Sequence, residues 1–161
     1  MFAKRMATLQ ARMADNGMDA ALITDDDSVY YFSGYYDYLH MEFGRPTILL
    51  VTPEHGSSLI TPSMESHMAE AAAQVDQLAF WNDGMGEEWR ETLPSALGSA
   101  RRIGYEPDQM PPIVQNYLTA LIDKDRLADV TPIVSDIRMI KSPDEIQLAR
   151  HAGQVANAMM A

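Results

Sequence analysis

The chain has 161 residues, 47% of them hydrophobic and 22% charged, which is the composition of an ordinary globular domain able to bury its own core. Its net charge of −11 disfavours phosphate backbones and anionic lipids, and no apolar run approaches the about 20 residues that cross a bilayer. The chain contains no cysteine, which excludes disulfides and thiol chemistry. We therefore expect a cytoplasmic protein that binds neither nucleic acid nor membrane.

Short apolar runs alternate with segments whose apolar residues recur every three or four positions, a pattern typical of an α/β domain. Strands are predicted at residues 20–23, 47–51, 58–60, 78–81, 102–105 and 127–130. Helices are predicted at residues 2–13, 64–75, 89–97, 112–121 and 143–159. The predicted apolar face is Met64, Met68, Ala71 and Val75 in the second of these and Trp89, Leu93 and Leu97 in the third. Because residues 53–56 form a turn between two strands, the sequence predicts a mixed sheet of about six strands flanked by helices.

Three consecutive aspartates, Asp25 to Asp27, follow the first predicted strand and precede Ser28. Side chains of these types cap the free N–H groups at a helix start. A signalling receiver domain also carries acidic residues at this place, with a lysine that Lys141 could supply. However, no aspartate stands at the end of a central strand to accept a phosphoryl group. Helix capping is therefore the favoured interpretation.

The C-terminal segment begins with a strong helix-start signal. Ser142 and Glu145 have the spacing of a capping box, with Pro143 at the first helical position. Apolar residues continue to Met159, and no glycine or proline ends the helix. We therefore expect a domain at residues 1–140 and a linker helix at residues 141–161, cut short, whose apolar stripe packs on a missing part of the chain.

Seven of the 13 aromatic residues lie between positions 30 and 43. The first three, at positions 30–32, are expected to pack a helical turn into the core. Aromatic rings with polar tips also favour pockets and interfaces. The candidate substrate-binding or interface residues are therefore Tyr36, Asp37, His40 and Arg45. Arg45 could pair with a substrate carboxylate, or it could be a solvated residue at a strand start.

Catalytic and metal-binding motifs are not found in the sequence. The four histidines have no spacing typical of metal ligands. No Gly-x-Ser-x-Gly motif occurs, and the glycine pair at residues 84–86 matches no phosphate-binding loop. We therefore predict neither a catalytic residue nor a metal ligand within this chain.

Four segments, in this order, resemble the N-terminal domain of the creatinase/prolidase/aminopeptidase P family. They are Gly17 to Ile23, Ser28 to Tyr35 (similar to the family's N-x-x-Y-L-T-G-Y turn), Ile103 to Glu106 (I-G-x-E), and Ile137 to Ile146. Together they cover the whole chain. Ser28 stands where the family commonly has asparagine, and Phe32-Ser33 replaces Leu-Thr.

The resemblance implies a second, pita-bread catalytic domain that follows this one. That domain binds two divalent metals, commonly manganese, cobalt or zinc, through two Asp, one His and two Glu, and none of these positions lies in this chain. No cofactor is therefore expected in this fragment, which itself is predicted to be inactive.

The resemblance also implies a function for the full-length protein. This is the hydrolysis of Xaa-Pro bonds, with the present domain contributing to dimerisation and substrate access. The expected partners are the chain's own C-terminal catalytic domain, a second copy in a homodimer, and a peptide or small-molecule substrate. Two alternatives remain: the N-terminal domain of a creatinase-like C–N hydrolase, or a stand-alone binding or dimerisation module.

Overall fold

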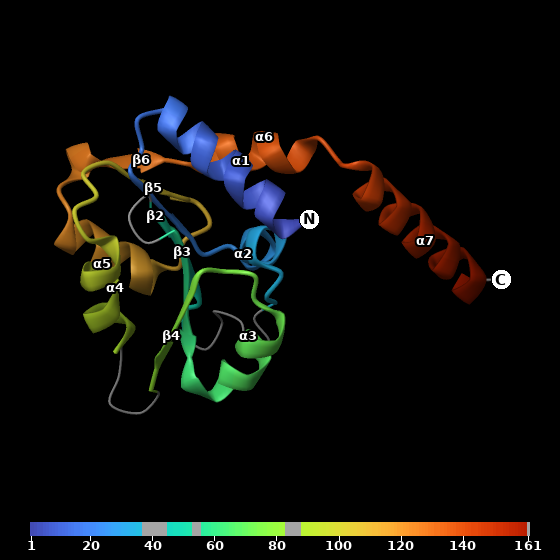
Figure 1. Ribbon diagram of the computed structural model, residues 1–161, viewed down its shortest axis with the longest axis horizontal. Coiled ribbons are helices and arrows are strands. Elements are labelled where there is room, and N and C mark those ends of the chain that lie inside the picture. The colour runs from blue at the N-terminus through green and yellow to red at the C-terminus, as the bar shows by residue number, and fades with distance from the viewer. Residues whose placement is uncertain (37–44, 53–55, 83–87, 161) are drawn as a thin grey trace.

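The computed structural model describes residues 1–36, 45–52, 56–82 and 88–160 (Figure 1). Within these residues a single six-stranded sheet has the order β4-β3-β2-β1-β5-β6. Its strands are β1 (Ala20–Ile23), β2 (Ile48–Thr52), β3 (Gly56–Pro62), β4 (Gln77–Trp81), β5 (Ile103–Tyr105) and β6 (Leu127–Asp129). The pairs β1–β2 and β2–β3 are antiparallel, and the other neighbours are parallel. The predicted mixed sheet is confirmed.

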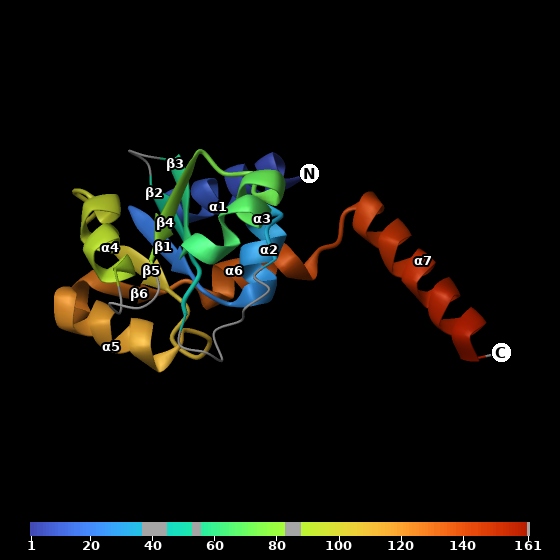
Figure 2. The same ribbon diagram turned by 90° about the horizontal axis from the view of Figure 1, so that it is seen from below.

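Helices cover both faces of the sheet. On one side lie α1 (Phe2–Asp15), α2 (Asp26–Ser33) and α6 (Thr131–Met139), and on the other α4 (Trp89–Leu97) and α5 (Pro112–Leu121) (Figures 1 and 2). The shorter elements are η2 (Ser63–Glu65), α3 (Ser66–Ala72) and η3 (Lys124–Arg126). The last helix, α7 (Pro143–Met160), projects away from this body in both views.

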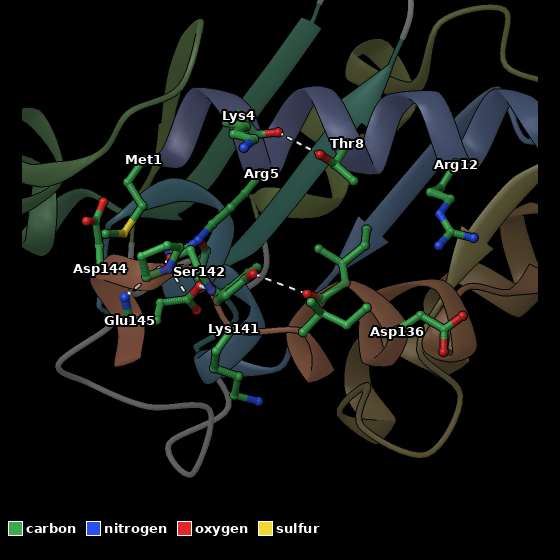
Figure 3. Close-up of a pocket in the computed structure, with 14 residues that line it drawn as sticks. Met1, Lys4, Arg5, Thr8, Arg12, Asp136, Lys141, Ser142, Asp144 and Glu145 are labelled. Carbon is green, nitrogen blue, oxygen red and sulfur yellow. Dashed lines mark hydrogen bonds and ion pairs between the residues drawn. The ribbon is translucent and has the colours of Figure 1, made fainter. Parts of the chain in front are cut away.

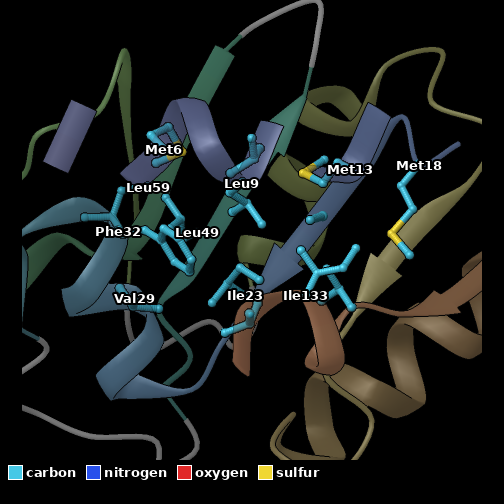
Figure 4. Packing of buried hydrophobic residues seen from close by; sticks show 14 of the residues in the cluster. Met6, Leu9, Met13, Met18, Ile23, Val29, Phe32, Leu49, Leu59 and Ile133 are labelled. Atoms are coloured by element: carbon cyan, nitrogen blue, oxygen red, sulfur yellow. The ribbon is translucent and has the colours of Figure 1, made fainter. Parts of the chain in front are cut away.

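Two hydrophobic clusters result from the alternation of side chains along the strands. In β1, Ala21 and Ile23 point to the α1–α2–α6 side, whereas Ala20 and Leu22 point to the α4–α5 side. This follows the two-residue period of a β-strand, with apolar residues on both faces because helices cover both. Figure 4 shows the first cluster, in which α1 lays Met6, Leu9 and Met13 over the sheet.

The predicted apolar face of α4 is confirmed. Trp89, Leu93 and Leu97 are all buried in the second cluster, and the Trp89 ring meets Tyr117 of α5 edge-on at 5.3 Å between centroids. Pro94 lies inside the helix, so one backbone N–H is missing there. The spacing of the apolar residues nevertheless keeps one continuous face against the sheet.

Close packing requires glycine at two positions. A Cβ on Gly104 in β5 would lie 2.9 Å from Val130 Cβ and 3.0 Å from Met18 Sδ. Gly34 ends α2 in the left-handed region, with φ of 77°, and the Phe2 ring lies 3.0 Å from where its Cβ would stand. The first glycine lets β5 approach its neighbours, and the second turns the chain out of α2.

The helix prediction needs two corrections. The α6 helix was not predicted, although Pro132 at its start was an available signal. The helix predicted at residues 64–75 is shorter, and its predicted apolar face is wrong because Met64 and Met68 are 62% and 45% exposed. Ala69 is the buried residue of α3, so the small side chain rather than the large ones meets the sheet.

Candidate functional site

The start of α2 is built by the aspartate run that follows β1. Asp25 is the N-cap, and its Oδ2 accepts hydrogen bonds from the backbone N–H of Ser28 at 3.0 Å and from Ser28 Oγ at 2.8 Å. This satisfies a helix N–H that would otherwise lack a partner. The helix-start interpretation of the run is therefore confirmed.

Glu106 reaches the same place from the neighbouring strand. Because β5 runs parallel to β1, residues that follow the two strands meet at one edge of the sheet. The Glu106 carboxylate accepts from the N–H of Thr24 at 3.3 Å, and weakly from Asp25 N–H at 3.5 Å and Ser28 Oγ at 3.4 Å. Burial, assisted by the negative charge of Asp25, raises the pKa of Glu106 to about 7.

Arg138 adds a positive charge from α6. Its Nη1 lies 3.1 Å from Asp25 Oδ2 and donates to Ser28 Oγ at 2.8 Å, while Nη2 lies 3.5 Å from Asp27 Oδ2. We call Asp25, Ser28, Glu106 and Arg138 the strand-end network. It joins the ends of β1 and β5 to α2 and α6: both acidic residues accept from Ser28, and Asp25 also pairs with the half-buried Arg138.

A second polar cluster holds the start of α7. Ser142 and Glu145 form the predicted capping box: Ser142 N–H donates to Glu145 Oε2 at 2.8 Å, and Glu145 N–H donates to Ser142 Oγ at 3.3 Å. Arg5 Nη2 of α1 lies 3.1 Å from Glu145 Oε1. Burial opposes the ionisation of Glu145, but the hydrogen bonds from Ser142 and the Arg5 charge outweigh it and lower its pKa.

Arg5 also contacts α2. Its guanidinium stands 3.8 Å from the centroid of the Tyr31 ring, and Nη1 donates to the Tyr31 carbonyl at 2.9 Å. The Tyr31 hydroxyl in turn donates to the carbonyl of Ile137 at 3.3 Å. Burial, then the negative charge of Glu145, raises the pKa of Tyr31. One arginine therefore connects three helices at the point where α7 leaves the domain.

A groove of about 520 Å³ runs between α1 and this junction (Figure 3). Basic, acidic and apolar residues line it: Met1, Lys4, Arg5, Thr8, Arg12, Tyr31, Asp136, Ile137, Ile140, Lys141, Ser142, Pro143, Asp144 and Glu145. No pairing of a nucleophile with a general base is found in this lining, because the hydroxyls of Thr8 and Ser142 serve the backbone.

Of the four candidate residues from the aromatic segment, the structure describes Tyr36 and Arg45. Asp37 and His40 lie outside the described residues. Tyr36 is 45% exposed and meets the Tyr30 ring edge-on at 6.1 Å between centroids. Arg45 is half-buried just before β2. The expectation that positions 30–32 all pack inward holds for Phe32, which is fully buried, but is wrong for Tyr30, which is 47% exposed.

Sequence reasoning missed the residues that carry most of the observed polar geometry, namely Arg5, Glu106 and Arg138. Glu65 was also missed, although it is buried and accepts a hydrogen bond from the hydroxyl of buried Tyr35. A signal existed for Glu106, since it ends the Ile-Gly-x-Glu segment. The two arginines had none, because their partners lie far away in the sequence.

The described residues provide no group of three or more His, Cys, Asp or Glu side chains placed to hold a metal ion. None of the described helices combines the length and apolar character needed to span a bilayer.

Comparison with known families decides the relationship. Residues 5–140 match the family model described as the creatinase/prolidase N-terminal domain. The chain belongs to this family. The creatinase/prolidase N-terminal domain described here is 25% identical over 158 residues to the creatinase of Bacillus sp. (strain B-0618), covering 96% of this chain and 37% of that protein.

Solved structures show the same fold. The prolidase of Pyrococcus horikoshii OT3 is similar with a TM-score of 0.76 and 25% identity, over 98% of this chain and 42% of that one. A proline dipeptidase of Streptococcus pneumoniae TIGR4 matches with a TM-score of 0.72 and 19% identity, over 84% of this chain and 98% of that one. The chain thus spans well under half of the creatinase and of the Pyrococcus prolidase.

Proposed function

We propose that this chain is the non-catalytic N-terminal domain of a cytoplasmic metal-dependent hydrolase of the Xaa-Pro dipeptidase/aminopeptidase P type. In this proposal the two divalent metal ions are bound by a catalytic domain that follows α7. The observation that carries it is α7 itself. The helix is capped and anchored at its first turn, yet none of its 18 residues is buried.

The α7 helix has a wide apolar face. At about 100° per residue, one half of its circumference collects Ile146, Leu148, Ala149, Ala152, Gly153, Val155, Ala156, Met159 and Met160. The five large side chains among them are between 42% and 90% exposed. Most helices gain their stability from packing such a face, and we assign this one to the chain's own catalytic domain.

A role in substrate access and dimerisation is the second part of the proposal. Tyr36 and Tyr30 present exposed rings beside the segment that contains Asp37 and His40. Exposed tyrosines are typical of interfaces because each offers an apolar ring and a polar tip. We assign Tyr36, Asp37, His40 and Arg45 to the contact with a peptide substrate or with the second subunit of a homodimer.

A creatinase-like hydrolase acting on a non-peptide C–N bond is the alternative. It is favoured by the similarity to the Bacillus creatinase over 96% of this chain. The peptidase assignment is favoured by the similarity to the Pyrococcus prolidase, which has 25% identity and covers 98% of the chain.

Activity measurements separate these possibilities. The complete gene product and residues 1–161 alone are assayed with manganese on a panel of Xaa-Pro dipeptides and on creatine. We expect the complete protein to cleave the dipeptides and residues 1–161 to cleave nothing. Manganese-dependent cleavage by residues 1–161 would contradict the proposal, and cleavage of creatine alone by the complete protein would favour the alternative.

A further inference from the structure

We infer that Arg5 is a positioning residue that fixes the direction in which α7 leaves the domain. All the contacts that support this inference lie within the described residues of this chain. Only its consequence, the placement of a catalytic domain that follows α7, rests on the proposed function.

Arg5 has the contacts that such a role requires. It extends from α1, stacks on the Tyr31 ring of α2 at 3.8 Å, donates to the Tyr31 carbonyl at 2.9 Å, and lies 3.1 Å from Glu145 of α7. The side chains of Arg5 and Glu145 are only 11% and 16% exposed. The planar guanidinium of Arg5 is held by Tyr31 as well as by Glu145, and both charged side chains are largely shielded from solvent. The ion pair therefore has a defined geometry, unlike most surface ion pairs.

The rest of α7 supplies no competing anchor. Among the described residues, α7 forms no other ion pair with the domain and buries no residue against it. The remaining polar contacts of its first turn are the capping box, which joins Glu145 to Ser142 and not to the domain. The angle between α7 and the domain therefore depends on the Arg5–Glu145 contact and on the short connection that precedes the helix.

That connection is fixed on its N-terminal side. Tyr31 binds the Ile137 carbonyl, Lys141 Nζ donates to the Arg138 carbonyl at 2.6 Å, and Arg138 belongs to the strand-end network. The end of α6 is thus tied to α2 through Tyr31 and Arg138, and to the start of the connection through Lys141. Ile140, between α6 and α7, is in extended conformation and 81% exposed, so the backbone there can rotate once Arg5 no longer holds Glu145.

Spin-label distance measurements on residues 1–161 test the inference. The chain has no cysteine, so Gln10→Cys on α1 and Gln154→Cys on α7 introduce one label each at exposed positions. We expect a narrow distance distribution in the parent and a distribution at least about twofold broader in Arg5→Ala. Arg5→Lys should also broaden it, because lysine keeps the charge but loses the planar fork and the stacking.

Two further variants separate direction from helix formation and from general stability. Glu145→Gln keeps a residue suited to the capping box but removes the charge, so it should broaden the distribution while the circular dichroism of the helix is unchanged. Lys4→Ala is the matched control: Lys4 is the neighbouring exposed cation of α1, and its side chain forms no ion pair among the described residues. It should leave the distribution narrow.

A folded Arg5→Ala or Glu145→Gln variant with a distribution as narrow as that of the parent would overturn the inference, and so would equal broadening by Lys4→Ala. The measurement uses residues 1–161 only. Its failure would leave the proposed hydrolase function standing, and a failure of the activity assays would leave this result standing.

Discussion

The strand-end network and α7 show two opposite uses of polar residues in one small domain. In the network, Glu106 is 2% exposed and is contacted from β1 and α2, while Arg138 ties in α6. At α7, the polar contacts are confined to the first turn, and the apolar face beyond it stays exposed.

This contrast predicts that the strand-end network contributes to the stability of the domain, whereas the exposed face of α7 does not. Buried polar groups are costly when one partner is lost, so changes in the network should weaken the whole domain. Changes along the exposed part of α7 remove no packing from this domain and should leave its free energy of unfolding unchanged. In the proposed function, this exposed face of α7 contacts the catalytic domain.

The largest expected difference in unfolding free energy is between a substitution in the core and one in α7. Phe32→Ala removes a fully buried ring from the first cluster and should lower the free energy of unfolding by about 3–5 kcal/mol. Met159→Ala, at a position that is 83% exposed, should change it by less than about 0.5 kcal/mol. Urea unfolding followed by fluorescence measures both, and similar losses in the two variants would contradict the separation.

The next effect concerns pH. The pKa of Glu106 is raised from 4.5 to about 7 in the folded state, so between these values the unfolded chain releases its proton while the folded chain keeps it. Stability should therefore fall as pH rises through this window, by about 3 kcal/mol in total, and no further contribution is lost above it. Glu106→Gln removes this contribution.

The measurement is the difference in unfolding free energy between wild type and Glu106→Gln, determined from pH 4 to pH 8. The variant should gain relative to the wild type as pH rises toward 7. Glu91→Gln, at an exposed position of α4, is the control and should follow the wild type. A wild-type–Glu106→Gln difference that does not depend on pH would show that Glu106 keeps an ordinary pKa.

A smaller and local effect is expected at the cap of α7. Ser142→Ala removes the oxygen that accepts the Glu145 N–H and should cost the helix about 1 kcal/mol. Because α7 buries no residue against the domain, this should appear as lower helicity in circular dichroism without a change in the unfolding midpoint. Gln154→Ala, later in the same helix, should not lower helicity. A lower midpoint with unchanged helicity would count against the separate anchoring of α7.

A further small effect on stability is expected at the exposed aromatic rings. Tyr36→Ala and Tyr30→Ala each remove a ring of similar exposure and the edge-on contact between the two rings, worth about 0.5–1.5 kcal/mol beyond the area that it buries. Tyr30→Ala also removes a second edge-on contact, with Phe2. In the complete protein, Tyr36→Ala should also change KM or kcat, whereas Tyr30→Ala should not. Equal kinetics in the two variants would remove Tyr36 from the candidate site.

Much of the fold follows from local sequence patterns. The capping box at Ser142 and the buried face of α4 are each specified by residues close together in the chain, so periodicity and cap chemistry were enough. The prediction of the buried face of α3 was wrong because the large Met64 and Met68 side chains suggested burial. In the structure Ala69 is the residue that packs against the sheet.

The polar site could not be obtained in the same way. Glu106 meets Ser28 across 78 positions, and Arg138 meets the same serine across 110. Such pairs are created by the parallel arrangement of β1 and β5 and by the return of α6 to α2. Neither can be read from the spacing of neighbours, and α6 itself was not predicted.

The central claim is that α7 has an apolar face which the rest of a longer protein covers. Hydrogen exchange of the α7 amides, compared between residues 1–161 and the complete gene product, tests this most directly. We expect fast exchange throughout Ile146 to Met160 in residues 1–161 and exchange at least about tenfold slower in the complete protein, as packing removes helix fraying. Equally fast exchange in both would contradict the claim.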